Sequence, residues 1–224
     1  MTSHYDLPGK LSAGKEAMTL AYNVYLFNGL IASSGLGASS LSAAQLASVA
    51  QTLQGYFSQV VSKHDALAGA RGTKYGAASV RWITGPAAIA PNELLVYLMP
   101  FGATVAKNGK LEMGSPPPNH DGLTNPMATG VASEVYLHFS DPAIISALMF
   151  HEAMHNKLAL GNDGLHRRGG LAGSPVGAST PLTPSNVQDM AAALDTSRPQ
   201  WTIGIGLLVA ESQRSDNDPL KGLL

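Results

Sequence analysis

The stretch DPAIISALMFHEAMHNKLALG, residues 141–161, carries the start and stop signals of a single helix. Asp141 can accept hydrogen bonds from the first free amides, and Pro142 suits the first helical position. Gly161 is expected to end the helix. Apolar residues fall on both of its sides, which predicts that it is buried in the centre of the domain. We therefore expect the fold to be built around residues 142–160.

This helix carries two histidines and a glutamate in a pattern that predicts a metal centre. His151 and His155 are four residues apart, so both imidazoles can bind one ion. Glu152 projects in a neighbouring direction, where it misses the metal yet can reach a water bound to it. Zinc lowers the pKa of such a water to roughly 7, so a carboxylate can accept its proton at neutral pH. The pattern predicts attack of a zinc-bound water on a carbonyl carbon.

A third metal ligand must come from beyond the helix, because a catalytic zinc takes three protein ligands and keeps one position open. The chain contains no cysteine, so the ligand is His, Asp or Glu. His166 is the first candidate, since the glycine-containing segment 161–164 can turn the chain back beneath the helix. Asp163 is the competitor, because a carboxylate also binds zinc. The remaining possibility is a more distant acid, such as Asp189 or Glu211.

Elsewhere, spacing predicts the other elements of an α+β domain. Apolar residues at three- and four-residue steps predict helices over residues 12–31, 42–63 and 185–194, with Ser42 capping the second and Thr183 or Ser185 the third. Alternating or continuous apolar runs predict strands over 79–84, 93–99 and 131–139. Residues 108–130, with three consecutive prolines, are predicted to form a surface loop.

The charge and hydropathy of the chain limit the kinds of partner and location that we expect for the protein. The net charge is −1 and no block of Lys or Arg occurs, so nucleic acid is not an expected partner. No apolar run of about 18 residues occurs, so no membrane span is expected. The beginning of the chain lacks the apolar core of a secretory signal. We therefore expect a soluble protein, cytoplasmic or exported without a classical signal peptide.

The motif of residues 151–155, followed by Gly161 and His166, resembles the zincin metallopeptidases, and more narrowly a divergent metzincin. In metzincins two residues separate the second histidine from the glycine, and two more separate the glycine from the third histidine. Here five residues separate His155 from Gly161, and four separate Gly161 from His166. Residues 181–194 are similar to the helix that follows the metzincin methionine turn. Residues 169–180 contain no methionine, so segment 174–176 or Met190 is a candidate for its place, and no tyrosine follows Tyr136.

The resemblance, which covers about residues 131–194, implies one zincin-like domain over residues 1–224. It implies an α+β fold in which a mixed twisted sheet with backing helices, within residues of about 11–160, lies above a central active-site helix. An irregular C-terminal subdomain, about 161–211, would lie below. It also implies a zinc metallopeptidase, with endopeptidase activity favoured, that acts on a peptide or protein substrate. Glu152 would be the base and then the acid, and zinc would be held by His151, His155 and His166.

The family's substrate-binding edge strand often lies just upstream of the active-site helix, which points to residues 132–139. Val135, Tyr136 and Leu137 are therefore candidate substrate-binding residues. Arg167 is another candidate, because a cation beside the metal can stabilise an oxyanion, although a solvated or ion-paired arginine is the alternative. The rival function is a non-catalytic binding protein on a zincin scaffold, with a structural or lost metal.

Overall fold

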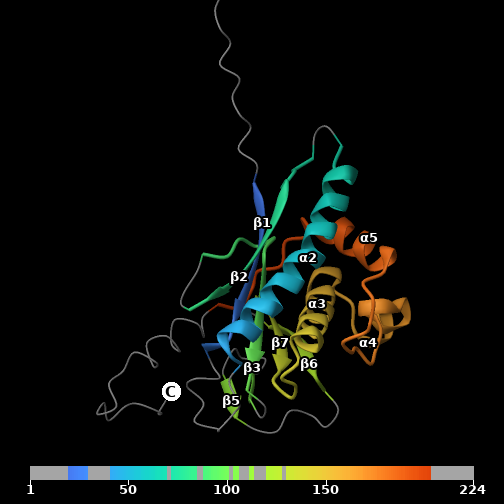
Figure 1. Ribbon diagram of the computed structural model, residues 1–224. Helices are drawn as coiled ribbons and strands as arrows, with labels where there is room; N and C mark the ends of the chain where they lie inside the picture. The colour runs from blue at the N-terminus through green and yellow to red at the C-terminus, as the bar shows by residue number, and fades with distance from the viewer. Residues whose placement is uncertain are drawn as a thin grey trace, which may run out of the picture.

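A five-stranded mixed sheet forms the centre of the computed structural model, which describes residues 20–29, 41–69, 72–84, 88–100, 103–105, 111–113, 120–127 and 130–202. The strand order is β2-β1-β3-β7-β6 (Figure 1). The four parallel strands are β1 (Ala21–Phe27), β2 (Ala77–Ile83), β3 (Leu94–Met99) and β7 (Gly130–Tyr136). Strand β6 (Gly122–Met127) runs antiparallel to β7 and ends the sheet. Strands β4 (Ala103–Val105) and β5 (Leu111–Met113) pair separately.

Helices α2 (Ala43–Leu67) and α3 (Pro142–Leu158) cover one face of this sheet, and α5 (Pro184–Ala193) packs against both (Figure 1). Between α3 and α5 lie the short helices α4 (Asn162–Leu165), η1 (His166–Arg168) and η2 (Gly170–Ala172). The α+β class and the mixed sheet are confirmed. No helix among the described residues combines the length and apolar character needed to cross a bilayer.

The helix predicted over residues 12–31 is wrong where the structure describes that segment, because residues 21–27 form strand β1. Tyr22, Val24 and Leu26 face the core beneath the helices, whereas Tyr25 and Phe27 enter a second apolar cluster on the other face. A strand buried on both faces is apolar along its whole length, so its residues also match a helical spacing. The rest of that prediction lies outside the described residues.

Residues 108–130 are not one surface loop, since they contain β5 and the whole of β6. Gly122 and Pro126 gave β6 the composition of a loop. An edge strand tolerates both residues, because one side of its backbone needs no partner in the sheet. The strand forms because its register with β7 pairs Gly122 with Val135 and Pro126 with Val131.

The other predicted elements are present. Helix α2 begins with Ser42, whose hydroxyl accepts from the Gln45 amide, and continues to Leu67 instead of residue 63. Thr183, and not Ser185, caps α5. The three predicted strands correspond to β2, β3 and β7.

Helix α3 begins as predicted but ends earlier than expected. The Asp141 carboxylate accepts from the Ala143 amide, and Pro142 is the first helical residue. Residues 145–157 are all buried, which confirms the central position. The helix ends at Leu158, and Ala159 adopts a left-handed conformation with φ of 55°. The expected stop at Gly161 is therefore wrong, and the early turn has a consequence for the site that the helix carries.

Candidate metal centre

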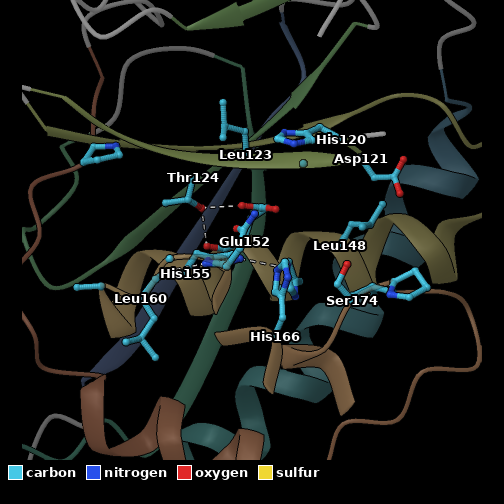
Figure 2. Close-up of a pocket in the computed structure, with 18 of the residues that line it drawn as sticks. His120, Asp121, Leu123, Thr124, Leu148, Glu152, His155, Leu160, His166 and Ser174 are labelled. Carbon is cyan, nitrogen blue, oxygen red and sulfur yellow. Dashed lines mark hydrogen bonds between the residues drawn. The ribbon is translucent and has the colours of Figure 1, made fainter. Parts of the chain in front are cut away.

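Three histidines converge beside the buried helix (Figure 2). His151 and His155 project from α3, and His166 is the first residue of η1. Their ligand nitrogens all lie within 4.8 Å of one another, close enough to bind one metal ion. The Nε2 atoms of His151 and His155 are 3.1 Å apart. Two nitrogens on a tetrahedral zinc would be about 3.3 Å apart, given bonds near 2.05 Å, so the spacing fits a metal before one binds.

Backbone carbonyls fix the orientation of the two helix histidines. His151 Nδ1 lies 2.8 Å from the Leu171 carbonyl oxygen, and His155 Nδ1 lies 2.6 Å from that of Leu160. A carbonyl only accepts, so both Nδ1 atoms carry the proton and both Nε2 atoms present lone pairs to each other. Lone pairs at 3.1 Å repel unless a cation lies between them. The left-handed Ala159 brings the Leu160 carbonyl back to His155, which explains the early end of α3.

The two histidines of α3 are in the protonation state that binds a metal. Burial lowers the pKa of His151 to about 4, although the hydrogen bond to Leu171 raises it in part. Burial also lowers the pKa of His155. Both imidazoles are therefore neutral at physiological pH, as ligation requires. His166 adds a third nitrogen, because its Nε2 atom is buried and has no hydrogen-bond partner among the residues that the structure describes.

His166 reaches the centre because the short helix before it is anchored in the core. Leu165 is fully buried, and its amide donates to the carbonyl of Gly161. The competing acids lie elsewhere: Asp163 is exposed, and Asp189 pairs with Arg168 at 2.6 Å. Glu211 falls outside the described residues. Among the described residues, the cluster thus contains the three predicted histidines and neither Asp163 nor Asp189.

Glu152 lies directly beneath β6 and is almost fully buried. Its Oε2 atom accepts a hydrogen bond of 2.8 Å from the Thr124 hydroxyl (Figure 2). Burial raises the pKa of the carboxyl to about 8, although the Thr124 hydrogen bond lowers it in part. A Cβ atom on Gly122 would lie 2.5 Å from Oε1, so only glycine leaves room for this carboxylate. Two residues of β6 therefore determine where Glu152 sits.

These groups share a cleft of about 390 Å³ between β6 and the helices. His120, Asp121, Leu148 and Ser174 lie at one side of Glu152, and Leu160 lies at the other (Figure 2). The remaining lining residues come from β6, the end of α3 and the chain beyond it: Gly122, Leu123, Thr124, Pro126, Ala159, Gly161, Asn162, Pro175, Val176 and Arg198, together with the three histidines. The cleft gives the cluster an open side.

The structure does not place the predicted substrate-binding residues of β7 in the cleft. Val135, Tyr136 and Leu137 are buried and none lines the cleft. Strand β7 is paired on both sides, by β3 and by β6, so it has no free edge for a peptide. β7 precedes α3 in sequence, but the preceding strand β6 folds back outside it and takes the edge position. Arg167 is exposed and does not line the cleft either.

Segment 174–176, one candidate for the place of the missing methionine, lines the cleft. Met190, the other candidate, is buried in the main core and does not line it. The sequence analysis did not single out Gly122, Thr124 or Arg198, which also line the cleft. Their contributions depend on tertiary placement, and no local pattern singles them out.

Comparison of the chain with protein-family models, with curated proteins and with solved structures finds no match. The geometry of the cleft therefore carries the functional argument.

Proposed function

We propose that the protein is a zinc-dependent metalloprotease of the zincin type. The observation that carries the proposal is the arrangement of four side chains in one cleft. Three histidines converge through their ring nitrogens, and Glu152 lies beside them without joining the cluster. A site that only holds a structural metal needs neither a carboxylate that is not a metal ligand nor a cleft beside the metal. A hydrolytic site needs both.

The ligand set supports zinc as the resident metal. Imidazole nitrogens suit zinc, copper, iron and nickel, and three histidines with one open position are a common arrangement for catalytic zinc. When bound, zinc would supply Lewis acidity, lowering the pKa of water and polarising the substrate carbonyl. His151, His155 and His166 would hold it, and the Leu171 and Leu160 carbonyls would keep the first two rings in the binding tautomer.

Glu152 has the position of the general base. A cation held by the neighbouring histidines would lower the pKa of this carboxyl, which burial raises to about 8. In its ionised form Glu152 would accept a proton from the water that attacks the carbonyl carbon of the peptide bond. It would then give that proton to the amide nitrogen as the C–N bond breaks, which leaves a carboxylic acid and a free amine. The Thr124 hydroxyl holds the carboxylate toward the cleft, and its hydrogen bond stabilises the ionised form.

The edge strand β6 supports a peptide as the substrate. The Tyr136 amide donates to the Asp121 carbonyl, so residues 121, 123, 125 and 127 bond to β7 in the alternating ladder. The backbone groups of Gly122 and Thr124 and the carbonyl of Pro126 therefore point away from β7, along the cleft. An extended peptide can add to them as a sixth strand, with its scissile bond above Glu152.

The fold adds further support. The mixed sheet and the central helix agree with the architecture that the resemblance implies, whereas the region after α3 is more helical than the irregular subdomain it implies. Among residues 159–202, the structure has short helices, α5 and one isolated bridge at Gln200.

Metal analysis and hydrolysis by the same preparations test the proposal. The purified full chain is expected to carry about one zinc per molecule and to cleave casein or a peptide library. Glu152→Gln should keep the zinc and lose at least about a hundredfold in kcat/KM, since a general base contributes typically that much. Asp163→Asn is the matched control, because Asp163 is exposed near the site and should change neither.

Zinc bound without hydrolysis of any peptide would contradict the proposal and favour a binding protein with a structural metal. A preparation that takes up no metal, even after zinc is added back, would contradict it as well.

A further inference from the structure

Arg198 is a cation in the cleft whose charge has no partner among the described residues. Its side chain lines the cleft, and its Nη1 atom is buried without a hydrogen-bond partner. The ion pairs of the described chain join His64 to two aspartates and Arg168 to Asp189, and none includes Arg198. An arginine stays charged at every physiological pH. Burying part of it unpaired is unfavourable, so the guanidinium, as the described residues leave it, is suited to bind an anion.

The backbone of Arg198 is fixed to the helix that carries the metal ligands. Lys157 donates to the Thr196 carbonyl at 2.7 Å. The Gln200 side chain bonds that of Asn156 at 2.9 Å and also donates to the Arg198 carbonyl. Asn156 and Lys157 directly follow His155, so segment 196–200 is held beside the last turn of α3. The backbone of Arg198 is thus held beside the helix that carries two of the histidines, so binding has to order only the Arg198 side chain.

Charge differs along the cleft. Asp121 lies with Leu148 on one side of Glu152 (Figure 2). The backbone of Arg198 is anchored beside the opposite end of α3, toward Leu160. A substrate with a carboxylate near Arg198 would gain an ion pair, and the reverse orientation would bring that carboxylate toward Asp121. The planar guanidinium suits a carboxylate because it can donate two parallel hydrogen bonds.

We propose that Arg198 makes this site selective for peptides with a carboxylate near the scissile bond, on the side of the cleft toward the C-terminal end of α3. The carboxylate is an Asp or Glu side chain or the free C-terminus of the peptide. This inference rests on the proposed function only in taking the ligand of the cleft to be a peptide. Arg198 is the specificity determinant, and Glu152 and the histidines do the chemistry.

Equilibrium binding tests the inference without depending on turnover. The probe is a set of alanine-based hexapeptides, each with one Glu moved through the six positions and a matched peptide with Gln. Every peptide is made with a free and with an amidated C-terminus. Zinc-loaded full-length Glu152→Gln protein is titrated with each by calorimetry. One Glu position, or the free C-terminus, should bind about tenfold more tightly than its neutral match, as expected for one charge-assisted ion pair.

Adding Arg198→Gln should abolish that difference while leaving the affinity for the neutral peptide within about twofold. Arg198→Lys should keep part of it, because the charge remains and the two parallel donors are lost. Arg81→Gln is the charge-matched control, since Arg81 is exposed on β2 at the far end of the sheet, and it should change nothing. The position that responds identifies a side chain or the C-terminus as the recognised group.

Equal affinities within every pair, including no measurable binding by either member, overturn the inference. A preference that survives Arg198→Gln overturns it too. If carboxylate binding depends on Arg198 but wild-type protein hydrolyses no peptide, the inference stands and the protease proposal fails. If the wild-type protein hydrolyses peptides but shows no carboxylate preference, the protease proposal stands and the inference about Arg198 fails.

Discussion

The contact between Gly122 and Glu152 gives the sharpest prediction about how β6 supports the site. In Gly122→Ala, the new Cβ would lie 2.5 Å from Glu152 Oε1 and 2.9 Å from the two carbons behind it. Ordinary contact begins at 3.4 Å, so the carboxylate must move by about 0.9 Å. The end of the side chain is the part that can move, and moving it draws Oε2 away from the Thr124 hydroxyl.

A displacement of about 1 Å at a catalytic group costs on the order of a hundredfold in rate, so kcat/KM should fall by roughly that factor. Overpacking should lower the free energy of unfolding by about 1–3 kcal/mol. The zinc content should not change, because the substitution touches none of the histidines. Gly55→Ala is the control: nothing lies within 4 Å of that site on α2, and alanine there should stabilise the protein by about 0.5–1 kcal/mol.

Urea unfolding, metal analysis and hydrolysis of one peptide would be measured on both variants. The reasoning is refuted if Gly122→Ala unfolds at the wild-type midpoint, or if it loses zinc together with activity. The first result would mean that Glu152 is not confined beneath β6, and the second that the damage spreads to the histidines. The stability measurement is informative even if the substrate differs from the one proposed.

Three further predictions concern the metal, the turn after α3 and a carboxylate near the end of α2. His166→Ala should weaken zinc binding by at least about a hundredfold, because only two ligands remain. In a thermal melt, zinc should stabilise the wild-type protein but hardly stabilise this variant. Unchanged zinc affinity would exclude His166 as a ligand. Ala159→Gly should raise the free energy of unfolding by up to about 1 kcal/mol, since alanine at φ of 55° is strained and glycine is not; a clear loss of stability would argue against the left-handed turn. Burial raises the pKa of Asp65, but hydrogen bonds from the Tyr75 and Gly76 amides outweigh it and leave the pKa below its usual value. A carboxyl whose pKa is lowered in the folded state stabilises the protein at pH values above its unfolded pKa, and this stabilisation is lost as the pH falls. Asp65→Asn should therefore lower the free energy of unfolding by about 1 kcal/mol at pH 7. Its unfolding midpoint should approach that of the wild type below about pH 4.

Local signals predicted the centre of the fold and most of the site. The capping residues Asp141 and Pro142, the apolar content of α3 and the spacing of His151 and His155 all act within a few turns of chain. His166 was also found, because the turn that returns it begins within the same stretch. For such features the sequence nearby contains nearly all the physical causes.

The remaining features depend on distant partners. β1 could be read as a helix because both its faces are buried, and only the sheet and α2 distinguish the two readings. β6 is a strand because β7 pairs with it. Gly122 in this strand leaves room for the carboxylate of Glu152, which is 30 residues later in the sequence. The segment that contains Arg198 is held beside α3 by a buried hydrogen bond between the side chains of Gln200 and Asn156. The sequence around neither residue predicts this bond.

Lys157 bears on the order in which the chain folds during its synthesis. Its side chain is 1% exposed, and the ammonium donates to the carbonyls of Asn92 and Thr196. Thr196 is translated 39 residues after Lys157, so for that interval one of the two acceptors does not yet exist. Burying α3 before then would leave a charged donor short of a partner. Packing around the helix that carries His151 and His155 is therefore completed only after Thr196 has been synthesised.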